Sequence, residues 1–329
     1  MFVAAHAREW DRLEELTRHS RTLSGSEADE LVDLYQRAAT HLSVVRSAAP
    51  DPALVGRLSS LVARARGVVT ASGAPAYREV ALFFGRRFPA ALYRTRYWWL
   101  TVGAVFVAVA LALAWWVLAN PDVQARLATP DQVRQLVDQN FASYYSSHPA
   151  GAFAFQVWTN NAWVAALAIA SGALLGIPIP LILWANAANV GVIAGLMAAH
   201  GRLAEFFGLI LPHGMLELTA VFVASGAGLR LGWTALAPGD RPRGAAVAEE
   251  GRAAVGIAMG LVAVLLVSGV IEAFVTPSGL PTWARIGVGA AAWAGFLTYV
   301  FVPGRRAALA GETGDVDAED VGDSRPVAA

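Results

Sequence analysis

Six apolar stretches follow one another between residues 97 and 303, and they limit the fold more than any other feature of the sequence. About 20 apolar residues in a helix cross the hydrocarbon core of a bilayer. Within lipid, only helices and closed barrels satisfy every backbone hydrogen bond. The sequence therefore predicts an all-α, polytopic membrane helix bundle of about six spans, at 97–119, 154–176, 181–199, 206–229, 255–275 and 282–303.

The composition agrees with a membrane protein and excludes several kinds of site. Of the 329 residues, 56% are hydrophobic and the mean hydropathy is +0.48, which is too apolar for an ordinary soluble domain. The chain has no cysteine, so disulfides, thiolate nucleophiles and cysteine-ligated metals are excluded. All 25 basic residues are arginine, which excludes a catalytic or phosphate-binding lysine. The formal net charge is +0, so we expect a lipid bilayer and no nucleic acid as a partner.

The chain divides into three parts by composition. Residues 1–96 are charged and carry apolar residues at helical spacing, which predicts a cytoplasmic helical bundle. The end of this part, 77–96, mixes arginine with phenylalanine and is either a basic amphipathic helix at the membrane or an ordinary bundle helix. Residues 97–303 form the membrane domain, with an outer loop at 120–153. The acidic tail 304–329 is expected to be disordered.

Arginines predict the orientation of the spans. They lie before the first span, between the fourth and fifth, and after the sixth, at Arg86, Arg87, Arg94, Arg96, Arg230, Arg241, Arg243, Arg252, Arg305 and Arg306. An even number of spans puts these groups and both chain termini on one side. Because cytoplasmic loops are enriched in basic residues, that side is expected to be the cytoplasmic face of the inner membrane.

His213 and Glu217 are unusual because they lie inside the fourth apolar stretch. They are the only ionisable residues from Phe206 to Leu229, and a spacing of four places them on one face of a helix. Pro212 and Gly214 flank the histidine, and both residue types weaken a helix. The pattern predicts a kinked or broken helix whose polar pair faces other helices instead of lipid.

Further polar residues fall at similar depths in other spans. With a rise of about 1.5 Å per residue, the predicted topology brings four more side chains toward the outer half of the bundle. We therefore expect one polar intramembrane cluster made of Asn160, Asn161, Asn189, His213, Glu217 and Glu272.

The sequence leaves open what such a cluster does. It is either a structural hydrogen-bond network between helices or an ion, proton or metal site with His213 and Glu217 as ligands or relay groups. No catalytic residues are identified, because the metalloprotease, serine-hydrolase and phosphate-loop motifs are all missing from the sequence. An enzyme is therefore the less favoured class, and no cofactor is expected.

Several motifs occur in the order typical of one known family. They are Asn160-Asn161, Gly172, Gly176, Asn186, Pro212-His213-Gly214 with Glu217 and Ala220, Gly226, Gly228, and Ile271-Glu272-Ala273-Phe274 with Pro277. Over about 150–280 the chain resembles the stage II sporulation protein M (SpoIIM) family. The resemblance implies a multi-span membrane protein linked to a peptidoglycan-remodelling complex with partner hydrolases.

Three functions follow as hypotheses. The first is a membrane scaffold that organises cell-envelope or peptidoglycan-remodelling machinery, with other envelope proteins or peptidoglycan hydrolases as partners. The alternatives are a transporter or channel that uses the polar cluster, and a membrane-embedded hydrolase. Small residues in the spans (Gly191, Gly195, Gly226 and Gly228) also predict an oligomer, most simply a homodimer.

Overall fold

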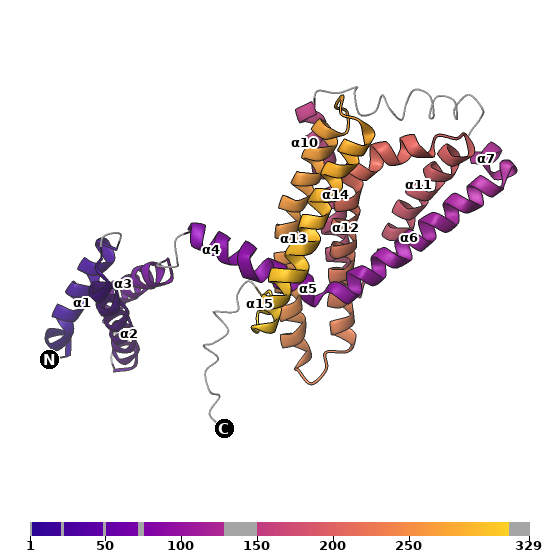
Figure 1. The fold of residues 1–329 in the computed structure, drawn as a ribbon. Coiled ribbons are helices and arrows are strands. Elements are labelled where there is room, and N and C mark those ends of the chain that lie inside the picture. Colours follow the sequence, from indigo (N-terminus) through magenta and orange to yellow (C-terminus); the bar gives the residue numbers. More distant parts are fainter. Residues whose placement is uncertain (1, 21–22, 49–50, 72–75, 128–149, 316–329) are drawn as a thin grey trace. The chain divides into compact units, whose positions relative to one another are not determined.

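The computed structural model describes residues 2–20, 23–48, 51–71, 76–127 and 150–315, in which every regular element is a helix (Figure 1). The chain separates into two compact units, Met1–Val80 and Ala81–Ala329. The predicted all-α class is thus confirmed for the described part of the chain.

The N-terminal unit is built from three helices around its own apolar core. These are α1 (Phe2–Arg18), α2 (Gly25–Ala48) and α3 (Pro52–Ala71). Each helix buries residues three or four apart, because that spacing places side chains on one helical face. The buried core consists of Trp10, Leu13, Leu16, Leu31, Leu34, Ala38, Leu42, Val45, Leu58, Leu61 and Ala65.

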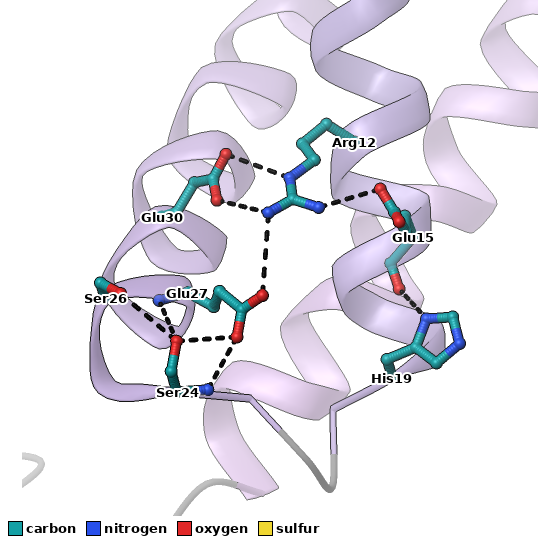
Figure 2. Close-up of polar contacts among 7 residues, drawn as sticks. All are labelled: Arg12, Glu15, His19, Ser24, Ser26, Glu27 and Glu30. Carbon is teal, nitrogen blue, oxygen red and sulfur yellow. Dashed lines mark hydrogen bonds and ion pairs between the residues drawn. The ribbon is translucent and has the colours of Figure 1, made fainter.

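Charged groups at the start of α2 fix it against α1 (Figure 2). The Glu27 carboxylate accepts hydrogen bonds from the amide of Ser24 at 2.8 Å and from its hydroxyl at 2.7 Å. This is a capping box, which satisfies amide groups that the first turn of a helix leaves unpaired. Arg12 of α1 donates from Nε and Nη2 to the two carboxylate oxygens of Glu30, at 3.2 and 2.9 Å.

These contacts shift the pKa values of both glutamates in the same direction. Hydrogen bonds from the backbone amide and then the hydroxyl of Ser24 lower the pKa of Glu27 below its usual 4.5. The hydrogen bond from Arg12 lowers the pKa of Glu30 below the same value. Both groups are therefore favoured in their charged form when the unit is folded.

The second unit contains the helices that are long and apolar enough to cross a membrane. Its elements after α4 (Ala76–Leu82) are η1 (Phe83–Arg87), α5 (Phe88–Arg94), α6 (Arg96–Ala119), α7 (Pro121–Leu127), α10 (Ala150–Ala170), η3 (Ser171–Leu174), α11 (Ile179–Ala199), α12 (Leu203–Leu236), α13 (Arg243–Val270), η4 (Ile271–Val275), α14 (Thr282–Tyr299), η5 (Val300–Gly304) and α15 (Arg305–Leu309). Among the described residues, five helices qualify as spans by length and composition: Arg96–Ala119, Ile179–Ala199, Leu203–Leu236, Arg243–Val275 and Thr282–Leu309.

The predicted second span, 154–176, corresponds to α10 and is not among these five. Its polar residues reduce its hydropathy, and regular α-helix ends at Ala170, before the left-handed backbone of Leu175 and Gly176. Nevertheless α10 runs beside α12 and α13 through the bundle (Figure 1). The indole of Trp158 donates to the carbonyl of Val262 on α13 at 3.1 Å. The helix therefore occupies the place of the predicted span.

Glycines allow the helices to approach α12 and one another closely. Gly226 lies against the backbone of Trp99, and Gly228 lies against the carbonyl of Ala168, so a Cβ at either position would overlap backbone. Gly191 and Gly195 of α11 meet the carbonyls of Ala110 and Ala114 on α6 in the same way. All four glycines from which a homodimer was predicted thus serve contacts within one chain, and the homodimer stays a prediction without this support.

The boundary between the units lies at Val80 and Ala81, earlier than the predicted boundary at residue 96. Within the intervening segment, the π-helix η1 separates α4 from α5. Phe88 to Leu92 are buried in the second unit, where Gly260 of α13 makes room for the Phe88 ring. Most of the predicted outer loop and acidic tail, at 128–149 and 316–329, lies outside the described residues.

The glutamate pKa values predict how the N-terminal unit responds to acid. A carboxyl group whose pKa is lowered by folding stabilises the folded state when the pH is above the pKa of the unfolded chain, about 4.5. This contribution is lost as the pH falls below 4.5 and through the lower pKa of the folded state. In a fragment of residues 1–80, Arg12→Gln should lower the melting temperature near neutral pH. The difference from wild type should shrink below about pH 4.5 in circular dichroism. Arg18→Gln, in the same helix, is the control, and a pH-independent difference would contradict the assignment.

Candidate intramembrane polar site

A cavity of about 770 Å³ lies in the second unit between α10, α11, α12 and η4. Both α10 and α11 pack on α12, but they make little contact with each other, and the cavity occupies the space between them. Its lining is polar for a site among apolar helices. The lining residues are Gln156, Thr159, Asn160, Asn161, Trp163, Asn186, Asn189, Val190, Ile210, His213, Gly214, Glu217, Leu218 and Glu272.

Three ionisable side chains converge on this cavity. An imidazole nitrogen of His213 and one carboxylate oxygen each from Glu217 and Glu272 all lie within 4.8 Å of one another. Nε2 of His213 is 3.9 Å from Oε1 of Glu272. His213 and Glu272 are each only 5% exposed. Glu217 is half-buried. The three groups form one cluster, in which any change of charge on one acts on the other two.

A bend in α12 positions His213. The ribbon of α12 changes direction within its N-terminal third (Figure 1), and Pro212 is the proline inside this helix. Proline lacks the amide hydrogen needed for the helical ladder and pushes against the preceding turn, which bends a helix. The hydroxyl of Ser268 on α13 donates to the carbonyl of His213 at 3.1 Å, and this bond ties the bend to the neighbouring helix. The predicted kink is a bend within a continuous helix.

Glu272 reaches the cavity from a π-helical turn, η4, at the end of α13. A π-turn accommodates an extra residue and so changes which side chains face the neighbouring helices. The hydroxyl of Thr276, at the end of this turn, lies 3.3 Å from Nδ1 of His213 and donates to the carbonyl of Ile271 at 3.4 Å. Arg285 of α14 donates from Nη1 to the carbonyl of Thr276 at 2.7 Å, which holds the turn in place.

The asparagines differ in their distance from the charged groups. The side chain of Asn161 is hydrogen-bonded to the carboxyl group of Glu217. Asn160 donates from Nδ2 to Oδ1 of Asn161 at the limiting distance of 3.5 Å. Asn189 lines the cavity from α11. The asparagines thus extend the polar lining of the cavity beyond the His213 cluster.

One atom of the cluster has no hydrogen-bond partner in the described part of the chain. Oε2 of Glu272 is buried and accepts no hydrogen bond from the described residues. An unsatisfied buried polar atom costs about 1–3 kcal/mol, and more if it is charged. A purely structural network is expected to pair its members, so this oxygen indicates that a partner other than the described residues completes the cluster.

The structure brings together all six residues of the predicted cluster, Asn160, Asn161, Asn189, His213, Glu217 and Glu272, in the lining of this one cavity. Four polar residues were not predicted for the cluster: Gln156, Thr159 and Asn186, which line the cavity, and Thr276, which contacts His213. Thr276 follows Glu272 by four residues, and Gln156 precedes Asn160 by four. Helical spacing from the residues already identified is the signal that could have found both.

A second cluster of possible ligands lies in the N-terminal unit. His6, Glu9 and His41 also present donor atoms within 4.8 Å of one another, and all three are half-buried. Trp10 donates from its indole nitrogen to Nδ1 of His41 at 3.2 Å, so a metal ion at that nitrogen would have to displace this hydrogen bond. The geometry is therefore less favourable for a metal than that of the His213 cluster.

The close packing of α14 on the bend allows a direct test of its importance. A Cβ at Gly289 would overlap the carbonyl oxygen of Pro212, whereas a Cβ at Gly287 of the same helix would meet nothing within 4 Å. Gly289→Ala should reduce stability by about 1–3 kcal/mol because backbone must shift. Gly287→Ala should change it little. Thermal unfolding of both variants in detergent measures the difference, and equal melting temperatures would refute the packing.

Comparison with known proteins places the chain in a family. The family model described as Stage II sporulation protein M matches residues 103–277, which include every residue of the His213 cluster. A second model, described as Domain of unknown function (DUF8413), matches residues 1–71, within the N-terminal unit. Neither a curated protein nor a solved structure matches the chain. Because the first match covers more than half of the sequence, the chain belongs to the stage II sporulation protein M family.

Proposed function

We propose that this protein binds a small ion or polar solute in the cavity around His213 and Glu217 and acts as a transporter or channel. The observation that carries the proposal is a hollow, polar site in an otherwise apolar helix bundle. Ionisable residues within membrane helices are expensive and usually mark ion or substrate pathways. A network that only joined helices would be close-packed, whereas this one borders about 770 Å³ of space.

The bend in α12 also supports transport. Transporters commonly place their binding sites where a membrane helix is interrupted, because the irregular backbone lines the cavity. Here Pro212 and Gly214 lie in α12 beside the ionisable pair, and η4 interrupts the regular helix at Glu272. A proline bend in one helix and a π-turn in another thus adjoin the same cavity.

We further propose that the arginine-rich end of the bundle faces the cytoplasm. Contacts bring the predicted arginine groups to one end. Arg94 lies 3.9 Å from Glu249 of α13, and Arg241 lies 2.5 Å from the same residue. Arg86 and Arg306 line a common pocket. An excess of arginine on one side of a membrane protein is typical of the cytoplasmic side. The protein would then lie in the inner membrane, with the first and last residues of the second unit on the cytoplasmic side.

Flux through proteoliposomes tests the proposed transport. Reconstituted protein should conduct at least one ion among protons, alkali cations and divalent cations, each followed with an ion-sensitive dye. Glu217→Gln should abolish this flux with little loss of stability, because an amide keeps the size and part of the hydrogen bonding but not the charge. Glu205→Gln is the matched control, since Glu205 lies in the same helix but pairs with Arg202 outside the cavity. Folded protein without flux for any of these ions would refute the proposal.

A scaffold for cell-envelope or peptidoglycan-remodelling proteins is the second candidate. It is supported by the family match together with the compact N-terminal unit, which has its own core and can present a separate docking surface. Affinity purification from membranes should then recover envelope proteins, including peptidoglycan hydrolases. Recovery should be unchanged by His213→Ala and lost on removal of residues 1–71. Partners that disappear only with His213→Ala would instead link binding to the cavity.

A membrane-embedded hydrolase has less support. No serine among the described residues lines the cavity, and the buried Ser225 of α12 is not part of its lining. A nucleophile needs a base within hydrogen-bonding reach, and the described residues offer no such serine–histidine pair. The cavity thus favours binding over hydrolysis by a serine nucleophile.

A further inference from the structure

The His213 cluster, which lines the cavity, contains the donor atoms of a metal site. We propose that His213, Glu217 and Glu272 bind a divalent first-row transition-metal ion of the zinc type. This inference rests on the proposed function, because it names the ligand of the same cavity. It is tested by equilibrium binding, which does not depend on whether transport occurs.

The distances suit a single ion. The three donor atoms lie within 4.8 Å of one another, and Nε2 of His213 is 3.9 Å from Oε1 of Glu272. Bonds of about 2.0–2.2 Å from zinc to nitrogen and oxygen place two ligands of a tetrahedral site roughly 3.3 Å apart. Small rotations of the two carboxylate side chains are enough to close this difference.

The hydrogen bonds around His213 favour the tautomer that a metal requires. The Thr276 hydroxyl donates its hydrogen to the carbonyl of Ile271, so its oxygen is arranged to accept from Nδ1–H of His213. Nε2 then carries the lone pair and faces the Glu272 carboxylate. Metal-binding histidines usually donate their other ring nitrogen to such a partner, which fixes the tautomer and orients the ring. Asn161 holds the Glu217 carboxyl group in the corresponding way.

Glu272 supplies an independent indication of a ligand. Its Oε2 is buried, lines the cavity with the rest of the side chain, and has no hydrogen-bond partner among the described residues. A cation at the centre of the cluster would satisfy this oxygen and compensate for two carboxylates held a few ångströms apart. The surrounding asparagine amides are uncharged and therefore do not neutralise the two carboxylates.

The chemistry of the donors selects the class of metal. One imidazole and two carboxylates match the nitrogen and oxygen ligands of zinc and related divalent ions. Magnesium and calcium prefer six or more oxygen ligands and do not use an imidazole, so they fit the cluster less well. Three protein ligands leave a fourth position, which opens toward the cavity where water or a solute can reach the ion.

Zinc binding to the purified full chain tests the proposal. The protein is prepared without a histidine tag, in nanodiscs, and titrated with Zn²⁺ by calorimetry and dye competition. All measurements are made in a His6→Gln background, because the N-terminal cluster also presents possible ligands. We expect one bound Zn²⁺ per chain that a large excess of Mg²⁺ does not displace. X-ray absorption should show only nitrogen and oxygen neighbours, including imidazole.

The variants identify the site. His213→Gln and Glu272→Gln should each weaken Zn²⁺ binding at least about 100-fold, because each removes a ligand, whereas Glu205→Gln should leave it unchanged. Thr276→Val keeps all three ligands but removes the hydroxyl that orients the histidine, and should weaken binding about 10–100-fold. If a ligand variant fails to fold, Thr276→Val still tests whether Zn²⁺ binds at this cluster. Melting temperatures without metal confirm that each variant is folded.

The outcomes separate this inference from the proposed transport. Absence of Zn²⁺ binding, or binding that neither His213→Gln nor Thr276→Val weakens, overturns the metal site, even if other ions are transported. Release of protons during the Zn²⁺ titration, with no Zn²⁺ bound to the protein, also overturns the metal site. Tight binding that depends on His213 supports the site, even if the proteoliposomes show no flux.

Discussion

Close backbone contact with α12 is the constraint on which the membrane unit depends. Within a bilayer, lipid tails are as apolar as the side chains, so burial alone does not hold helices together and packing must do so. Every other long helix of the second unit packs on α12. Gly226 and Gly228 allow backbone to meet backbone at the contacts with α6 and α10. This close approach fixes the positions of the surrounding helices, and hence the cavity between them.

The polar site lies where this close packing stops. Towards one end of α12, glycines bring α10 against it, whereas around His213 the helices α10 and α11 lie on either side of an open space. The bend near Pro212 is supported from two directions, by Gly289 of α14 and by the hydroxyl of Ser268 on α13. A rigid frame around a hollow polar centre is what a binding site requires.

The N-terminal unit follows different physical rules from the membrane unit. Its core is formed by leucines and Trp10, which are driven together by their removal from water. Its surface carries charged pairs such as Arg12 with Glu30, which are exposed and screened by salt. The two units thus have separate cores and separate family matches.

The sequence by itself determined the all-α class, the presence of five apolar spans and six of the polar residues that line the cavity. Apolar length identifies a span without any tertiary information, and ionisable residues such as His213 and Glu217 stand out against it. The limits of α10 were less predictable, because Asn160 and Asn161 lower the hydropathy of a helix that packs inside the bundle. Only the tertiary structure decided that Glu272 enters the cavity through a π-turn, that Thr276 contacts His213, and that the conspicuous glycines serve contacts within one chain. The physical reason is that periodicity specifies which face a residue occupies on its own helix. The partner that this face meets depends on how helices far apart in the sequence pack together.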